Sequence, residues 1–186
     1  MRDPKRVGIL ISGRGSNMRA LVEQARQYEV VLVASNRPSA PGLDWARDHG
    51  LATWARDSKG VEREEYDRIM SAALEEHGVG TIALAGFMRI LSPWFVKEWG
   101  GRIINIHPSL LPKYRGLDTH ARAIEAGDDA SGCSVHIVTD ELDAGEVLGQ
   151  AEVPIEGSDT PATLEQRVLA AEHRLYPMVL NDFVMR

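Results

Sequence analysis

Short apolar runs alternate with helical segments along the first half of the chain, and this alternation constrains the fold more than any other feature. The runs at residues 6–12, 29–35 and 81–85 are rich in β-branched and other apolar side chains, as expected of strands buried on both faces. Helical segments at 18–27, 43–49 and 62–77 separate the runs, the last of them amphipathic, and a further short strand is expected at 52–55. Repeated strand–helix units predict an α/β fold, a doubly wound (Rossmann-like), mostly parallel sheet whose ligand crevice lies at the carboxyl ends of the strands.

The second half predicts a different kind of strand pairing. Residues 132–139 alternate between apolar and polar, and residues 146–154 follow after a short polar turn. We expect this hairpin to add antiparallel strands at the C-terminal edge of the sheet. A long helix over 160–183 would close the fold, with Pro177 as a point where it could kink. The sequence contains no repeat or linker, so we expect a single domain over 1–186.

Composition excludes several classes of protein. The chain has 186 residues, enough for one domain with a substantial core. A formal net charge of -6 argues against a nucleic-acid partner, because duplex binding relies on a basic surface. No apolar run approaches the roughly 20 residues needed to cross a bilayer, and the single Cys133 cannot form an internal disulfide framework. We therefore expect a cytoplasmic protein with no nucleic-acid and no membrane partner.

A glycine-rich turn follows the first predicted strand. Residues 13–17 read Gly-Arg-Gly-Ser-Asn and lead into a helix expected over 18–27. Such a turn aims backbone N–H groups and a helix N-terminus at one point, which suits a phosphate. The turn lacks the Gly-Lys-Ser/Thr ending of a nucleoside triphosphate loop and the third glycine of a dinucleotide fingerprint. A monophosphate site with Ser16 and Asn17 as added donors remains, against the alternative of a merely tight turn.

Asn105 and His107 stand two residues apart, where a predicted strand over 103–106 ends. The two-residue period of a strand puts both side chains on one face. An amide can donate to a carbonyl oxygen that becomes an oxyanion, and an imidazole can exchange a proton near neutral pH. These are the needs of acyl-group transfer, and Asp143 could orient the imidazole. The residues alone leave open a turn-capping Asn beside a structural His.

Residues 86–91 are unusually apolar for a loop, and Ser92-Pro93 then has the signature of a helix start. Such a loop could hold a flat heteroaromatic ring, with Met88, Ile90 and Leu91 packed on the face of the ring. Simple core packing explains the same composition equally well.

Other polar and aromatic residues are expected to be structural. We expect His136 to pack inside its strand, and Trp94 and Trp99 to support the core. Thr119 could cap a helix over 120–126, and one X-Pro bond of the loop after His107 could be cis.

Five blocks of sequence recur together and in order in a known family. They are residues 12–17 (Ser-Gly-Arg-Gly-Ser-Asn), 85–93 (Ala-Gly-Phe-Met-Arg-Ile-Leu-Ser-Pro), 105–114 (Asn-Ile-His-Pro-Ser-Leu-Leu-Pro-Lys-Tyr), 134–136 (Ser-Val-His) and 140–145 (Asp-Glu-Leu-Asp-Ala-Gly). With them the chain closely resembles the phosphoribosylglycinamide formyltransferases of purine biosynthesis, a family of folate-dependent formyltransferases. The resemblance covers nearly the whole chain.

The resemblance implies transfer of the formyl group of 10-formyltetrahydrofolate to the amine of 5-phosphoribosylglycinamide, without a metal. It implies a catalytic set of Asn105, His107 and Asp143. The residues implied to hold the substrate phosphate and ribose are Gly15, Ser16, Asn17 and Glu172. Those implied to hold the folate are Arg63, Met88, Arg89, Ile90, Leu91, Asn105, Asp140 and Asp143. Residues 1–100 would then form the phosphate-binding half, and 101–186 the catalytic and folate-binding half.

The family reading leaves some questions open. The alternative is another enzyme that uses 10-formyltetrahydrofolate, either a hydrolase or a formyltransferase with a different amine acceptor. A folate- or phosphate-binding module would bind these ligands without turnover. Arg115 and Asp118 depart from some relatives, which puts the geometry of their loop in doubt. The assembly is also open, with a homodimer as one expectation.

Overall fold

The structure is a computed structural model that describes residues 2–186. Within these residues seven strands form one sheet in the order β3-β2-β1-β4-β5-β6-β7. The strands are β1 (Arg6–Ile11), β2 (Glu29–Ser35), β3 (Thr53–Ala55), β4 (Thr81–Leu84), β5 (Ile103–His107), β6 (Ala130–Ile137) and β7 (Val147–Pro154). Strands β1 to β5 pair in parallel, whereas β6 pairs antiparallel with β5 and β7 antiparallel with β6. The predicted mixed sheet, with antiparallel strands at its C-terminal edge, is confirmed.

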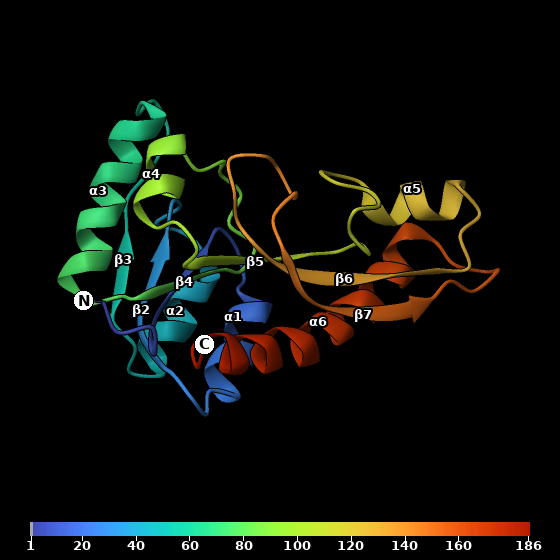
Figure 1. The fold of residues 1–186 in the computed structure, drawn as a ribbon, viewed down its shortest axis with the longest axis horizontal. Coiled ribbons are helices and arrows are strands. Elements are labelled where there is room, and N and C mark those ends of the chain that lie inside the picture. Colours follow the sequence, from blue (N-terminus) through green and yellow to red (C-terminus); the bar gives the residue numbers. More distant parts are fainter. Residues whose placement is uncertain (1) are drawn as a thin grey trace.

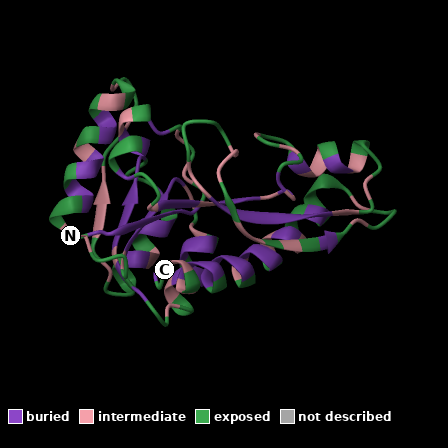
Figure 2. Ribbon diagram, in the orientation of Figure 1, coloured by how far each residue is buried: buried purple, intermediate pink, exposed green. Residues whose placement is uncertain are grey.

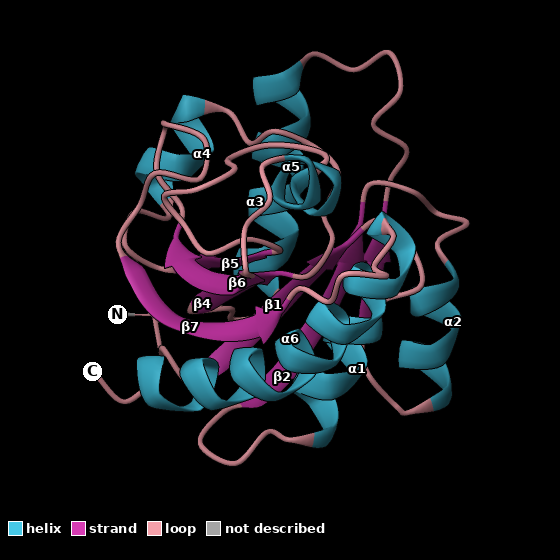
Figure 3. Cartoon of the chain, turned by 90° about the vertical axis from the view of Figure 1, so that its right-hand side faces the viewer, coloured by secondary structure: helices cyan, strands magenta, loops and turns pink. Residues whose placement is uncertain are grey.

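Helices cover the sheet on both faces (Figures 1 and 3). They are α1 (Ser16–Glu23), α2 (Pro41–Asp48), α3 (Arg63–Glu76), α4 (Pro93–Glu98), α5 (Thr119–Glu125) and α6 (Pro161–Phe183). One core cluster joins the sheet to α1, α2 and α6, and a second joins the other face to α3 and α4. Figure 2 shows buried residues along the inner strands and along the side of α6 that faces the sheet.

The helix ends follow the sequence in most places. The Ser92 hydroxyl accepts the Phe95 N–H at 3.2 Å and caps α4, as its Ser-Pro pair predicts. Thr160 caps α6 in a reciprocal capping box with Thr163. Helix α6 continues through Pro177 as one segment. The expectation that Trp99 is structural is also confirmed, since it is fully buried and its indole N–H donates to Ser71.

The expected boundaries of two helices are wrong. Thr119 is the first residue of α5 and not its cap, because Asp118 occupies the cap position in the left-handed region with φ 56°. The Thr119 hydroxyl donates instead to the Pro108 carbonyl at 2.7 Å. Helix α1 begins at Ser16, two residues earlier than expected, because Gly15 turns the chain with φ 73°, and it ends at Glu23, four residues before the expected end.

The order of the strands fixes where a ligand can bind. The chain moves from β1 to β2 and β3 on one side, and then returns to place β4 on the other side of β1. The loops that leave β1 and β4 therefore diverge to opposite faces and open a crevice at their carboxyl ends. His107 ends the next strand, β5. Leu111-Pro112, in the loop after β5, is a cis peptide bond.

Tyr176 fastens α6 to the same end of the sheet. Its side chain is fully buried, and its hydroxyl shares a hydrogen between the carbonyls of Leu84, at 2.9 Å, and Ile104, at 3.1 Å. Burial raises the pKa of Tyr176 well above its ordinary value, so the hydroxyl keeps its hydrogen. Among residues 2–186, no helix is both long enough and apolar enough to cross a membrane.

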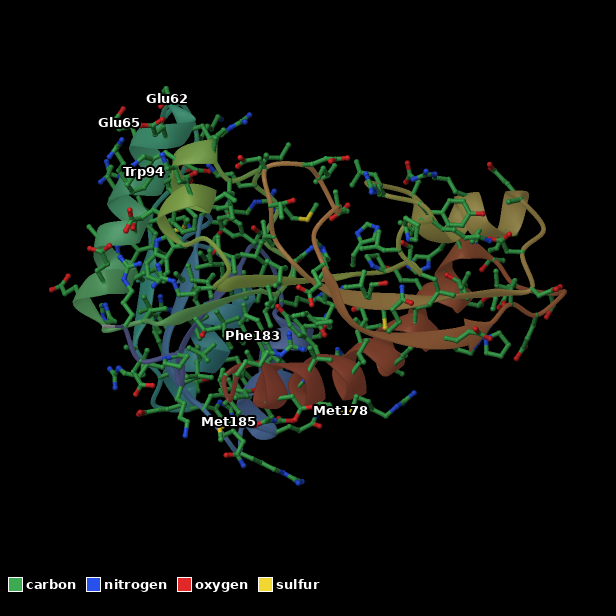
Figure 4. All side chains as sticks on the ribbon, in the orientation of Figure 1. Glu62, Glu65, Trp94, Met178, Phe183 and Met185 are labelled. Atoms are coloured by element: carbon green, nitrogen blue, oxygen red, sulfur yellow. The ribbon has the colours of Figure 1, made fainter. Side chains whose placement is uncertain are left out.

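Replacement of Tyr176 by Phe should destabilise the fold. Both carbonyls would lose a buried donor, and such a loss costs about 1–2 kcal/mol of unfolding free energy. Urea denaturation of the wild type and of Tyr176→Phe measures the difference. Met178→Ala on the outer side of the same helix is the matched control, because that side chain is 58% exposed (Figure 4). The control should change the unfolding free energy by less than about 0.5 kcal/mol, and an equally small change in Tyr176→Phe would refute the role of the hydroxyl.

Candidate active site

Loops from both halves of the chain gather at the carboxyl ends of the parallel strands. The first follows β1 and contains Gly15, the second follows β4, and the third follows β5. The loop between β6 and β7, which carries Asp143, arches over β5 and is drawn in orange in Figure 1. Residues far apart in the sequence therefore meet at one edge of the sheet.

Asn105 and His107 lie on the same face of β5, as the two-residue period predicts. Ile106 between them is 8% exposed and belongs to the core on the opposite face. Antiparallel pairing with β6 sets His136 opposite Asn105 and Ser134 opposite His107. Side chains of directly paired residues share a face, so β6 contributes to the site.

His107 lies between two acceptors. Its Nδ1 is 3.4 Å from Asp143 Oδ2, and its Nε2 is 2.8 Å from the Tyr114 carbonyl oxygen. A carbonyl oxygen can only accept, so Nε2 carries a hydrogen. The Asp143 carboxylate on the other side of the ring helps to hold its orientation. His107 is 5% exposed, and its ring is therefore held away from bulk water.

His136 is buried in its strand, as expected, but its ring also contacts polar groups of the site. Its Nε2 lies 3.3 Å from Asn105 Nδ2 and 3.5 Å from Asp143 Oδ1. Its Nδ1 faces the Ile137 carbonyl at 3.0 Å, which holds the ring in this orientation. His136 thus touches two of the three predicted catalytic residues. Its place opposite Asn105 depends on the register of β6, which the sequence does not reveal.

Asp143 is the carboxylate around which these groups are arranged. Burial favours a higher pKa, but contacts from His136, the Gly116 N–H at 3.0 Å and the charge of His107 outweigh it and lower the pKa of Asp143 below its ordinary value. Asp143 is therefore ionised at neutral pH. It also holds a backbone conformation that is uncommon for a non-glycine residue, with φ 50°.

The loop after β5 closes over this group. The Tyr114 carbonyl reaches His107, the Gly116 N–H reaches Asp143, and Arg115 forms an ion pair with Glu141 at 2.7 Å. Arg115 thus ties the loop after β5 to the loop that carries Asp143. This loop is the segment where the sequence left the geometry in doubt.

The glycine-rich turn presents free backbone donors to the same edge of the sheet. Gly15 precedes α1 in the left-handed conformation, and Ser16 and Asn17 begin the helix. The first N–H groups of a helix have no partner within it and carry the positive end of its dipole. Gly42 packs against this turn, where its N–H donates to the Gly13 carbonyl at 3.1 Å. The turn therefore has the donors that would suit an anion such as a phosphate.

Asn17 and Glu172 bond to each other. The Asn17 amide nitrogen donates to Glu172 Oε2 at 2.8 Å, although the residues are 155 positions apart. Both side chains are buried, and Asn17 Oδ1 has no hydrogen-bond partner among the described residues. Burial raises the pKa of Glu172 to about 7, against the opposing effect of the Asn17 hydrogen bond, and the charge of Glu165 raises it further.

The predicted folate residues are only partly brought together. In the loop after β4, Met88 and Ile90 are 64% and 63% exposed, whereas Leu91 is 8% exposed and belongs to the core. The expectation that Leu91 packs on a ring through its side chain therefore does not fit its burial. Arg63 is exposed at the start of α3, and Asp140 is exposed in the loop after β6. Within residues 2–186, no cluster of His, Cys, Asp or Glu could hold a metal ion.

Known proteins resemble the chain along nearly its whole length. A family model described as formyl transferase matches residues 5–180. The phosphoribosylglycinamide formyltransferase of Escherichia coli K12 is 45% identical over 180 residues, which cover 94% of this chain and 85% of that protein. The human trifunctional purine biosynthetic protein adenosine-3 is 43% identical over 95% of this chain, but the chain spans only 18% of that protein.

Solved structures agree with the sequence comparisons. The crystal structure of phosphoribosylglycinamide formyltransferase from Brucella melitensis superposes with a TM-score of 0.92 at 45% identity. The match covers 98% of this chain and 96% of that one. The fold, including its antiparallel edge, is therefore shared with these enzymes.

Glu172→Gln should make stability less sensitive to pH. The pKa of Glu172 rises from its ordinary 4.5 to about 7 in the folded chain, so the folded chain holds more protons than the unfolded chain between these values. Wild-type stability therefore falls as pH rises through this window, whereas the neutral glutamine has no proton to lose. We expect the variant to gain about 2–3 kcal/mol relative to the wild type between about pH 4.5 and about pH 8.

Urea denaturation at a series of pH values measures this difference. Glu76→Gln, at an exposed site on α3, is the matched control and should show no such trend. A constant difference between Glu172→Gln and the wild type across the window would contradict the raised pKa.

Proposed function

The chain belongs to the formyl transferase family, and from this premise we propose that it transfers the formyl group of 10-formyltetrahydrofolate to the amine of 5-phosphoribosylglycinamide in purine biosynthesis. The observation that carries the proposal is the convergence of Asn105, His107 and Asp143 at the end of the sheet where a helix N-terminus suited to a phosphate also lies. The whole-length match to bacterial phosphoribosylglycinamide formyltransferases supports the same reaction.

The acceptor substrate is proposed to bind along the β1 side of the crevice. Its phosphate would accept hydrogen bonds from the backbone N–H groups of Gly15, Ser16 and Asn17. The Asn17 amide nitrogen already serves Glu172, so the main-chain N–H is the donor we assign to Asn17. Glu172 would meet the ribose hydroxyls, which matches its place on α6 next to this turn.

The folate is proposed to bind between the loops that follow β4 and β6. Residues Met88 to Leu91 would supply main-chain groups to the edge of the pterin, with exposed Met88 and Ile90 against its faces. Arg89, Asn105, Asp140 and Asp143 would line the same slot. Arg63, exposed at the start of α3, would face the distal part of the folate.

Direct attack accounts for the chemistry with the groups present. The neutral amine of the ribonucleotide bonds to the formyl carbon, and the carbonyl electron pair moves onto oxygen as a tetrahedral intermediate forms. Asn105 and protonated His107 donate to this oxyanion. Collapse breaks the bond to the folate nitrogen, which gains a proton while the attacking nitrogen loses one.

Asp143 has two tasks in this scheme. Its ionised carboxylate orients the His107 imidazole, and it relays the transferred proton through water. The Nε2 hydrogen of His107 is bonded to the Tyr114 carbonyl in this structure. If Nε2 is the donor, substrate binding must exchange that carbonyl for the oxyanion, which makes the loop after β5 part of the reaction cycle.

Several wider expectations stay predictions. They are a cytoplasmic location, a homodimer, and a phosphate-binding half over 1–100 with a catalytic and folate-binding half over 101–186. The helix N-terminus at Ser16 and the loop after β4 both lie in the first half, whereas Glu172 comes from the second. The site therefore draws on both halves for each proposed ligand.

A single assay tests the function against its rivals. The protein is mixed with 10-formyltetrahydrofolate, and release of tetrahydrofolate is followed with and without 5-phosphoribosylglycinamide. We expect release only when the ribonucleotide is present, together with formylated ribonucleotide in equal amount. Release without an acceptor would favour a hydrolase, and binding without release would favour a binding module. Either result would overturn the proposal.

Asn105→Ala and His107→Ala should each lower kcat by about a hundredfold or more. Each residue donates to the developing oxyanion, and one such donor contributes on the order of 3 kcal/mol to the transition state. Steady-state kinetics measures the effect, with thermal unfolding as a check on the fold. His49→Ala, at an exposed histidine after α2, is the control and should keep wild-type turnover. Wild-type kcat in either folded site variant would remove that residue from the mechanism.

A further inference from the structure

The loop between β4 and α4, residues 85–92, is exposed at its tip and anchored at two points. Met88 and Ile90 are 64% and 63% exposed. The Met88 N–H donates to the Ser12 hydroxyl at 2.8 Å, and the Ser92 N–H donates to Asp67 Oδ2 at 2.6 Å. The first anchor comes from the end of β1, next to the glycine-rich turn. The second comes from α3, on the opposite face of the sheet.

Asp67 is an unusual residue for its position. It is 0% exposed and lies on the side of α3 that packs into an apolar cluster with Leu91 and Phe95. Its second carboxylate oxygen, Oδ1, is buried without a hydrogen-bond partner among the described residues. A buried polar group is unfavourable unless its partners compensate for lost water. The presence of a carboxylate at this buried position is therefore best explained by the hydrogen bond that it accepts.

Arg89 belongs to the loop 85–92 itself. Its guanidinium lies over the Tyr66 ring, 4.7 Å from the centroid, and its Nε is buried with no hydrogen-bond partner in residues 2–186. Burial raises the pKa of Asp67, while the Ser92 N–H and the charges of Arg89 and Arg63 act in the opposite direction. These opposite charges attract one another, although no ion pair joins Asp67 to either arginine among the described residues.

Helices α3 and α4 have a second contact, on their solvent-facing side. The Arg68 guanidinium lies 4.1 Å from the centroid of the Trp94 ring, so α3 and α4 also meet at the surface. Figure 4 shows Trp94 beside the end of α3 that carries Glu62 and Glu65. Because this surface contact does not involve Asp67, the two helices keep a point of attachment when Asp67 is altered.

We propose that Asp67 is a positioning residue for the folate, which fixes the path of the loop 85–92 by accepting the Ser92 N–H. The inference rests on the proposed function, because it takes Met88 to Leu91 as the folate-binding segment. Asp67 contacts neither substrate. It acts on the main-chain groups of the loop.

Two substitutions separate the charge from the hydrogen bond. Asp67→Asn keeps an oxygen that can accept the Ser92 N–H but removes the negative charge. Asp67→Ala removes both. We expect the KM for 10-formyltetrahydrofolate to rise about tenfold in Asp67→Asn and further in Asp67→Ala, where tenfold corresponds to about 1.4 kcal/mol. We expect kcat and the KM for 5-phosphoribosylglycinamide to stay within about twofold, because the catalytic group and the phosphate turn do not depend on Asp67.

Controls distinguish positioning from general stability. Glu76→Gln changes an exposed acid on the same helix and should leave all kinetic constants unchanged. Thermal unfolding of each variant reports the fold, and Asp67→Asn keeps the test decisive if Asp67→Ala does not fold. An unchanged folate KM in folded Asp67→Asn would overturn the inference. A parallel rise of both KM values, with a fall in kcat, would also overturn it, since that is the signature of a structural role alone.

A binding measurement separates this inference from the proposed function. Tetrahydrofolate is titrated into the wild type and Asp67→Asn under anaerobic conditions, and the dissociation constants are compared by calorimetry. About tenfold weaker binding by the variant supports the role of Asp67 even if the wild type does not transfer formyl groups. Equal affinity would overturn the role of Asp67 even if wild-type transfer is observed. Absence of tetrahydrofolate binding by the wild type would overturn the proposed function and the inference together.

Discussion

The buried carboxylate of Asp143 is the interaction on which the site depends. It lies within 3.5 Å of both histidine rings and accepts the Gly116 N–H at 3.0 Å. Three separate segments, β5, β6 and the loop after β5, are thereby held to one charge. An isolated buried carboxylate would be strongly disfavoured, so these donors must stay in place together for the charge to be retained. The same requirement fixes the orientation of the groups that are proposed to act on the substrate.

The antiparallel strands at the edge of the sheet make this arrangement possible. Because β6 runs against β5, His136 pairs with Asn105 and Ser134 with His107. The Ser134 hydroxyl donates to the Ser109 carbonyl at 2.7 Å and accepts the Leu111 N–H at 3.0 Å, which orders the loop that reaches back to His107. A sheet that ended at β5 would lack both contacts. The added strands are therefore part of the active site, as well as a cover for the edge of the sheet.

The sequence predicts features that depend on short-range periodicity and misses those that depend on register. Its apolar runs locate the strands, and the spacing of Asn105 and His107 correctly puts both on one face. His136 was expected to pack because an alternating strand does not tell which neighbour lies opposite a given residue. The Asn17–Glu172 bond spans 155 positions, a separation at which no local pattern reports contact. Thr119 was expected as a cap because hydroxyl caps are common. Asp118, in the left-handed conformation, occupies the cap position instead, so the helix begins one residue earlier than expected.

The two buried carboxyl groups of the site differ in pKa because different numbers of hydrogen-bond donors surround them. Asp143 has two imidazoles and a backbone N–H around it, and its pKa is lowered despite burial. Glu172 has the single amide of Asn17, and burial raises its pKa to about 7. Environments that shift two pKa values in opposite directions suit the two groups to different roles in a reaction. Asp143 is suited to hold a cation permanently, whereas Glu172 can exchange its proton near neutral pH. A phosphate beside Asn17 would favour the neutral form of Glu172, which could then donate a hydrogen bond to the sugar as well as accept one.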